Sequence, residues 1–121
     1  MALPINHRFD ERIIQTTAAS VGNGVAGVAR APCRGQITEV GTVIGSVVST
    51  ADATCTTSIA GAGVTGGSFV ITQAGSAIGD LDNALPTAAN VCNEGDAIKF
   101  AFSGTGTAGG HVYCYAVLKP I

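Results

Sequence analysis

Residues 51–90 constrain the fold of this chain most, because short β-prone runs alternate there with small turn-forming residues. The run SFVIT at residues 68–72, for example, is flanked by segments of Gly, Ala, Ser and Thr. The stretch contains no Lys, Arg, His or Glu, and its only acidic residues are Asp52, Asp80 and Asp82. This pattern is typical of strands joined by tight turns. It offers few groups for acid–base chemistry, which favours a structural building block over a catalyst.

Strand patterns continue on both sides of this stretch. Residues 35–50 are rich in β-branched side chains, and Gly41 and Gly45 interrupt their alternation, which predicts a bulge or bend. We expect further strands at residues 25–31, 53–60, 68–73, 97–103 and 111–119. Apolar residues share one face of the last two strands: Ile98, Phe100 and Phe102 in the first, and Val112, Cys114, Ala116 and Leu118 in the second.

The segments between these strands are expected to be turns or irregular structure. The glycine-rich residues 61–67 and 104–110 predict turns, and the strands that flank 104–110 are expected to form a hairpin. Residues 80–90 are expected to be irregular, since Pro86 excludes a central strand there. Residues 9–20 favour a strand, with a short helix over 9–14 as the alternative.

These patterns predict an all-β fold. Seven or eight strands with closely spaced turns are typical of an antiparallel β-sandwich or a jelly-roll-like single domain. We place this domain at residues 18–121, preceded by an extended N-terminal arm at residues 1–17. The arm contains Pro4 and lacks periodicity.

Charge is scarce in this chain. Only 12% of its 121 residues are charged, about half the ~25% usual for a globular domain. A surface of Thr, Ser, Gly and Ala is easily desolvated, which favours assembly with a neighbouring molecule. The net charge is −2 and no basic patch is present, which argues against nucleic acid as a partner.

Neither a secretory signal nor a membrane span is predicted. The N-terminal charges are not followed by an apolar segment of the ~7–15 residues that a signal needs. The longest apolar runs are far shorter than the ~18–20 residues that cross a bilayer. We therefore expect the protein to be made in the cytoplasm and kept there until something else releases it.

The four cysteines, Cys33, Cys55, Cys92 and Cys114, lie 22, 37 and 22 residues apart. No C-x-x-C pair is present, so neither a zinc knuckle nor a thioredoxin-like site is suggested. Three disulfide connectivities are possible. Two readings stay open: buried thiols that remain reduced, or disulfides that form later in an oxidising exterior.

Few residues suggest specific chemistry. His111 stands alone in a strand, so no catalytic triad is expected. Asp80 and Asp82 are expected to cap turns, with a calcium site as the alternative. The aromatic residues Tyr113 and Tyr115, with Phe100 and Phe102, are expected in core or interface packing. No catalytic residue, cofactor or metal ligand is predicted, and the chain is not expected to be an enzyme.

A series of short motifs runs through the body of the chain, at about residues 29–118. They are Ala31-Pro32, Gly35-x-Ile37-Thr38-x-Val40, Ala51-Asp52-Ala53-Thr54, Gly63-x-x-x-Gly67 through Thr72, Ala77 to Asp80, Pro86-Thr87-Ala88-Ala89-Asn90 and Gly95-Asp96. In these motifs the chain resembles the small β-rich decoration (cement) proteins of tailed-bacteriophage capsids. The four cysteines depart from the pattern of that family.

The resemblance implies a structural virion protein that binds the outer surface of the phage head and stabilises contacts between major capsid protein subunits. It also implies a homotrimer or dimer at a capsid symmetry axis, made in the host cytoplasm and located on the virion. We expect the arm to cross a subunit boundary. Its interface candidates are Leu3, Pro4, Ile5, His7, Arg8, Phe9, Arg12, Ile13 and Ile14.

Two other binding or structural roles remain open. The first is a receptor- or glycan-binding module of a head fibre or spike, in which an exposed Tyr113 or Tyr115 stacks on a sugar. The second is a small structural subunit of a shell or tail, although 121 residues are few for a major coat protein.

Overall fold

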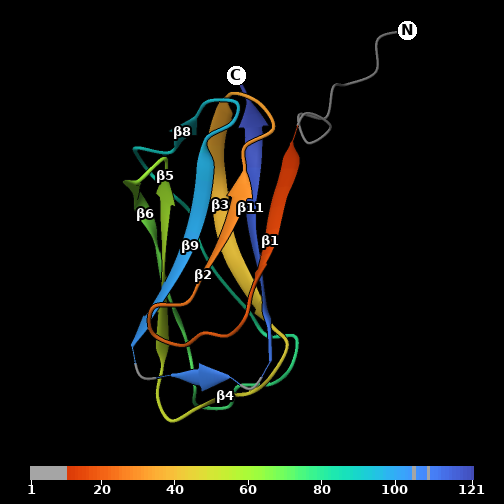
Figure 1. Cartoon of the computed structure of the whole chain (residues 1–121), viewed down its shortest axis with the longest axis vertical. Coiled ribbons are helices and arrows are strands. Elements are labelled where there is room, and N and C mark those ends of the chain that lie inside the picture. The colour runs from red at the N-terminus through yellow and green to blue at the C-terminus, as the bar shows by residue number, and fades with distance from the viewer. Residues whose placement is uncertain (1–10, 105, 109) are drawn as a thin grey trace, which may run out of the picture.

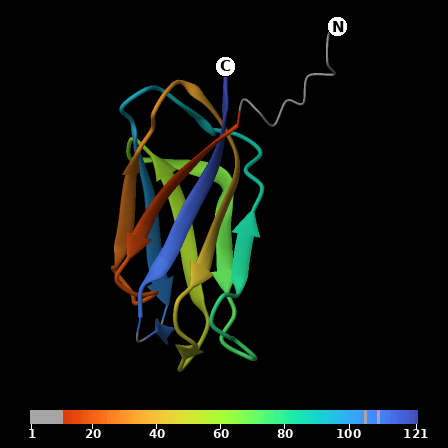
Figure 2. The same cartoon turned by 90° about the vertical axis from the view of Figure 1, so that its right-hand side faces the viewer.

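The structure, a computed structural model, describes residues 11–104, 106–108 and 110–121, and these ranges contain strands, turns and bends but no helix. Within the described part there is accordingly no helix that could span a membrane. Two antiparallel sheets face each other across one core (Figures 1 and 2), which confirms the predicted β-sandwich.

Sheet A has the strand order β1-β11-β3-β7, and β8 pairs with the start of β3. Sheet B has the order β2-β9-β5-β6. A small third ladder joins β10 to β4. The strands are β1 (Arg12–Ala18), β2 (Ala26–Arg30), β3 (Gly35–Ile44), β4 (Val48–Ser49), β5 (Ala53–Ile59), β6 (Ala62–Ile71), β7 (Leu81–Ala84), β8 (Val91–Cys92), β9 (Ala97–Gly104), β10 (Thr107–Ala108) and β11 (Val112–Pro120).

The core is built from the alternate residues that point between the sheets. The predicted inner faces are confirmed, since Ile98, Phe100 and Phe102 of β9 and the even-numbered residues 112–118 of β11 are buried. Two hydroxyl groups also lie in this core, those of Thr42 and Thr57, and neither has a hydrogen-bond partner among the described residues. Burial of apolar side chains from both sheets holds the sandwich together.

The predicted hairpin around residues 104–110 is wrong. β9 lies in sheet B, where it pairs with β2 and β5. β11 lies in sheet A between β1 and β3. The connecting segment crosses from one sheet to the other, and its β10 portion pairs with β4 at the lower end of Figure 1. Each strand has one apolar face, so it fits equally well into either sheet.

The predicted turn at residues 61–67 is much shorter than expected. The ladder between β5 and β6 already contains the pair Ile59 and Ala62, so only Ala60 and Gly61 form the turn. Both have positive φ, 50° and 87°, as the two central residues of a tight hairpin turn require. Part of the expected irregular region 80–90 is also ordered, as β7 at the edge of sheet A, ahead of Pro86.

The boundary of the predicted arm also needs correction. Residues 12–17 belong to β1, which pairs with β11 from Arg12 opposite Leu118 to Ala18 opposite Val112. β1 alternates between an exposed and a buried face, with Ile14 and Ala18 in the core, and that gain in apolar burial explains why it joins the sheet. The rest of the predicted arm, residues 1–10, lies outside the described residues.

The predicted bulge is displaced along β3. Gly41 is in regular register, opposite Tyr115 on one side and Asn83 on the other. The irregularity lies instead at Thr38, because the consecutive residues Val117 and Leu118 pair with Glu39 and Ile37. Gly45 follows the end of β3, where its N–H donates a hydrogen bond to the carbonyl oxygen of His111 (3.0 Å).

Candidate binding face on the outer side of sheet A

Three cross-strand rows of residues cover the outer side of sheet A. The strand register defines them as Ile13–Val117–Glu39, Gln15–Tyr115–Gly41–Asn83 and Thr17–Tyr113–Val43–Leu81. We call these residues the tyrosine face. They alternate along each strand with the residues that enter the core, so their side chains project away from it.

Tyr115 lies flat against the sheet because its cross-strand neighbour is glycine. A Cβ atom added at Gly41 would lie 2.5 Å from Oη of Tyr115 and 2.6 Å from Cε1 and Cζ. The glycine therefore leaves the space that the ring fills, and only 8% of Tyr115 is exposed. The ring of Tyr113 stacks beside it, with centroids 6.2 Å apart and planes inclined by 25°.

Hydrogen bonds connect the polar groups of the face to one another. The Tyr115 hydroxyl donates to Oε2 of Glu39 (2.5 Å), and Nδ2 of Asn83 donates to the same oxygen (3.1 Å). The Tyr113 hydroxyl donates to Oε1 of Gln15 (2.5 Å). Burial raises the pKa of Tyr115, and the hydrogen bond to Glu39 and the charge of Glu39 raise it further.

Apolar side chains border this polar centre. Ile13 on β1 is 56% exposed, and Leu81 on β7 is 53% exposed. Ile78 and Leu85, just before and after β7, are more exposed still. The face thus combines exposed apolar edges with a centre in which both tyrosine hydroxyls and Oε2 of Glu39 are already hydrogen-bonded. A surface of this kind loses little hydrogen bonding when a partner covers it.

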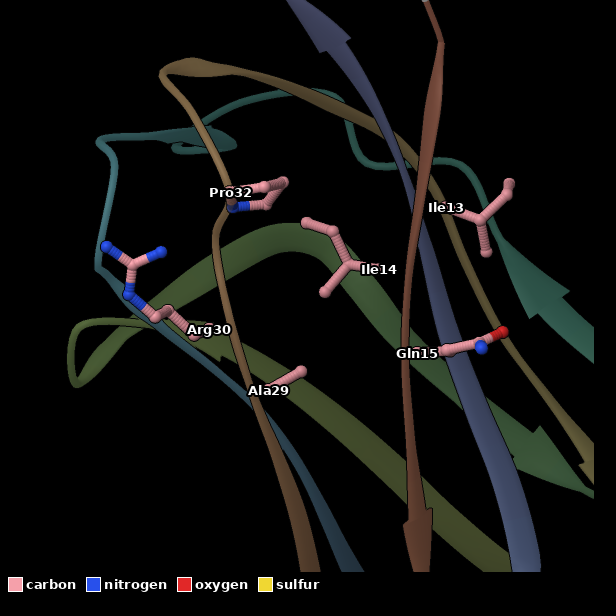
Figure 3. Close-up of a pocket in the computed structure, with 6 residues that line it drawn as sticks. All are labelled: Ile13, Ile14, Gln15, Ala29, Arg30 and Pro32. Atoms are coloured by element: carbon pink, nitrogen blue, oxygen red, sulfur yellow. The ribbon is translucent and has the colours of Figure 1, made fainter.

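A pocket of about 320 Å³ opens where the two sheets separate beside the tyrosine face, between β1 and β2. Figure 3 shows Ile14 of β1 with Ala29 and Pro32 of the β2 side pointing into it. Ile13 and Gln15 point to the opposite side of β1 (Figure 3). The side chains that reach inward are apolar, while Gln15 and Arg30 contribute polar groups to the lining.

The predicted interface residues lie in different parts of the chain's structure. Leu3, Pro4, Ile5, His7, Arg8 and Phe9 lie outside the described residues. Arg12 is exposed at the start of β1, and Ile13 belongs to the tyrosine face. Ile14 is buried in the core and lines the pocket, so it is not a surface contact residue. Successive side chains of a strand point to opposite faces, so a strand over residues 12–18 places Ile13 and Ile14 on opposite sides of the sheet.

The tyrosines and acidic residues also have defined positions. Neither tyrosine is fully exposed, since Tyr113 is half-buried and Tyr115 is buried. Asp80 caps a turn as predicted, with its Oδ2 accepting a hydrogen bond from the N–H of Ala77 (2.8 Å). Burial raises the pKa of Asp82, and the charge of Asp80 adds to this. Among the described residues, no group of three or more His, Cys, Asp or Glu side chains is placed to hold a metal ion.

The face itself could not be assembled from sequence alone. The predicted alternation of residues 111–119 between two faces of a strand places both tyrosines on the same face. No local pattern links Gln15, Glu39 and Asn83, because each lies on a different strand and their proximity depends on the strand order.

No protein-family model matches this sequence, and no curated protein matches it either. Solved structures with a similar fold include the catalytic domain of a GH87 alpha-1,3-glucanase in complex with nigerose. That structure has a TM-score of 0.55 and 10% sequence identity over 92% of this chain and 28% of its own. A second similar structure is the D1068A variant of a GH87 alpha-1,3-glucanase catalytic domain in complex with tetrasaccharides. It has a TM-score of 0.50 and 12% sequence identity, over 85% of this chain and 22% of its own.

A carbohydrate-binding module, CBM36 in complex with calcium and xylotriose, gives a TM-score of 0.46 and 16% identity, over 82% of this chain and 76% of its own. The chain spans less than a third of the glucanase chains. At these identities the glucanase likeness establishes a shared β-sandwich fold.

Proposed function

We propose that this protein is a non-catalytic decoration protein that binds the outer surface of an assembled phage capsid through the tyrosine face. The observation that carries this proposal is the make-up of that face. Its central polar groups are paired with one another, and exposed apolar residues flank them on both edge strands. Such a face fits a protein surface better than a small polar substrate.

The resemblance of residues 29–118 to decoration proteins is the support for proposing the major capsid protein as the partner. Glu39, the only carboxylate of the face, already accepts hydrogen bonds from Tyr115 and Asn83, which supports a structural role for it rather than a catalytic one. Several copies clustered at a symmetry axis, as a trimer or dimer, add their modest interfaces by multivalency. Binding the assembled shell and not its separate subunits stabilises the shell by mass action.

Co-sedimentation with mature shells that lack the protein tests this proposal. The double variant Ile13→Asp/Leu81→Asp places two charges on the tyrosine face. Val28→Asp/Val70→Asp is the matched control, because these residues are similarly exposed (54% and 49%, against 56% and 53%) but lie on the edge strands of sheet B.

We expect the tyrosine-face variant to lose at least about tenfold in affinity, since each carboxylate buried without a partner costs more than 1 kcal/mol. The control should bind like the unmodified protein. Equal loss in both variants, or loss in the control alone, would contradict binding through the tyrosine face.

A glycan-binding role is the second candidate, and the half-buried ring of Tyr113, stacked beside the buried Tyr115, favours it. Aromatic rings supply the flat apolar surface on which a sugar ring packs, and Gln15 and Asn83 lie beside them. A glycan array that includes nigerose, the ligand named for the structural neighbour, tests this role. Saturable binding that Tyr113→Ala abolishes would support a glycan module, and no binding to any sugar would exclude it.

A further inference from the structure

Cys33 and Cys92 are distant in sequence but adjacent in the fold. Cys33 lies in the bend between β2 and β3, and Cys92 ends β8, directly opposite Gly35 of β3. The thiol of Cys92 donates a hydrogen bond to the carbonyl oxygen of Cys33 over 3.9 Å, across 59 residues of sequence. Figure 1 shows β8 near the end of the sandwich where the C-terminus lies, at the top of the view.

Cys33 is the one half-buried cysteine; Cys92 is buried, and burial raises the pKa of its thiol, while the other two cysteines lie deeper between the sheets. Cys55 and Cys114 point into the core from opposite sheets, and neither is exposed. Burial raises the pKa of each thiol to about 12. A thiol with such a pKa is only about one part in 10⁵ thiolate at pH 7, so it reacts very slowly in the folded protein. Cys33, in contrast, is only half-buried, and an external reagent can reach it.

We propose that Cys33 and Cys92, which are free thiols in this structure, form a disulfide when the protein meets an oxidising environment. A small-molecule disulfide such as oxidised glutathione is the oxidant. The Cys33 thiolate attacks one glutathione sulfur, forming a mixed disulfide and releasing one glutathione thiolate. The Cys92 thiolate then attacks the Cys33 sulfur and releases the second. The cysteines lose two electrons, the reagent gains them, and the two cysteine protons end on the two glutathione thiols.

The geometry suits this bond. A disulfide needs Cα atoms within about 7 Å. Cys92 pairs directly with Gly35, two residues after Cys33, and its Sγ lies 3.9 Å from the carbonyl oxygen of Cys33, so the two cysteines are neighbours in the fold. Cys33 lies in a bend rather than a strand, so a small backbone shift that brings the two sulfurs together disturbs no strand pairing of Cys33.

The bond has a structural consequence for β8, a strand of two residues paired with Gly35 and Gln36. The disulfide fastens it to the segment that precedes β3. Because 59 residues separate the cysteines, the cross-link also restricts the unfolded chain. We therefore expect oxidation to raise Tm by roughly 5–15 °C.

The experiment is to incubate the folded protein with oxidised glutathione, block free thiols with iodoacetamide, and map peptides by mass spectrometry without reduction. We expect a loss of two hydrogens, a peptide pair joined through Cys33 and Cys92, and a rise in Tm that dithiothreitol reverses. Cys33→Ser should abolish the rise. Cys55→Ala, compared with its own reduced form, should keep it.

Three outcomes would overturn the proposal. The first is a lasting glutathione adduct on Cys33 with Cys92 unoxidised. The second is a cross-link through Cys55 or Cys114. The third is the expected cross-link without any rise in Tm, which would show that the bond strains the fold instead of fastening it.

Discussion

Replacing Gly41 with alanine tests the packing at the centre of the tyrosine face. The new Cβ would lie 2.5–2.6 Å from three atoms of the Tyr115 side chain. Cβ atoms in real structures essentially never come this close to another heavy atom, so something must shift. Tyr115 must therefore move off the sheet, and its hydrogen bond to Glu39 is lost or weakened. We expect the sandwich to fold but to be clearly less stable.

The size of the effect follows from three contributions. Inserting a methyl group into a tightly packed site costs about 1–3 kcal/mol. A hydrogen bond to a charged group contributes about 1.5–3 kcal/mol, and the low end applies here because Glu39 is half-buried. Alanine recovers about 0.5–1 kcal/mol relative to glycine in a strand. The net loss is about 1.5–4 kcal/mol, which lowers Tm by on the order of 10 °C.

Far-UV circular dichroism during urea unfolding measures this loss, since the chain has no tryptophan. Gly63→Ala is the matched control, because an added Cβ at this strand glycine meets no atom within 4 Å. It should be neutral or slightly stabilising. In a Tyr115→Ala background, Gly41→Ala should also cost less than about 0.5 kcal/mol, because the ring it displaces is absent. If Gly41→Ala costs the same with and without the Tyr115 ring, the proposed packing is wrong.

Three further predictions concern single residues. Thr57→Val should raise the free energy of unfolding by about 1 kcal/mol, because it removes a buried hydroxyl without a partner; urea denaturation that shows destabilisation would contradict this. Ala60→Asn should raise it by about 0.5–1 kcal/mol, because asparagine tolerates the positive φ of 50° better than alanine; calorimetry would reveal an unchanged or lower Tm if the turn differs. Tyr115 should ionise well above its ordinary pKa of 10.0 in an absorbance titration, and Glu39→Gln should shift that ionisation to lower pH. Because folding raises the pKa of Tyr115, the protonated hydroxyl contributes its full stabilisation below about pH 10, and this stabilisation is lost as pH rises further. A free energy of unfolding that increases above pH 10 would contradict the raised pKa.

Local patterns predicted those features of the fold that depend on one strand at a time. The alternation in residues 97–103 and 111–119 identified the inner faces, because period-two burial is a property of the individual strand. Those patterns could not assign β9 and β11 to different sheets, since the apolar face of a strand fits either sheet. The expected hairpin failed for this reason.

The candidate site depends on contacts between distant residues, so the sequence predicted less of it. From the sequence alone, Gly41 is predicted to interrupt a strand. In the structure, it leaves room for the side chain of Tyr115, its partner on the neighbouring strand. The Tyr115 hydroxyl binds Glu39 over 76 residues of sequence, and no local signal announces such a pair. Ile13 was predicted as an interface residue, and the structure places it on the tyrosine face, although the arm to which it was assigned is partly a strand.

The most direct measurement of the central claim compares binding of the unmodified protein to mature shells, unexpanded shells and free coat subunits by co-sedimentation. We predict saturable binding to mature shells alone, at a stoichiometry set by one class of symmetry axis. Equal binding to free subunits, or no binding to mature shells, would contradict a capsid-decoration role.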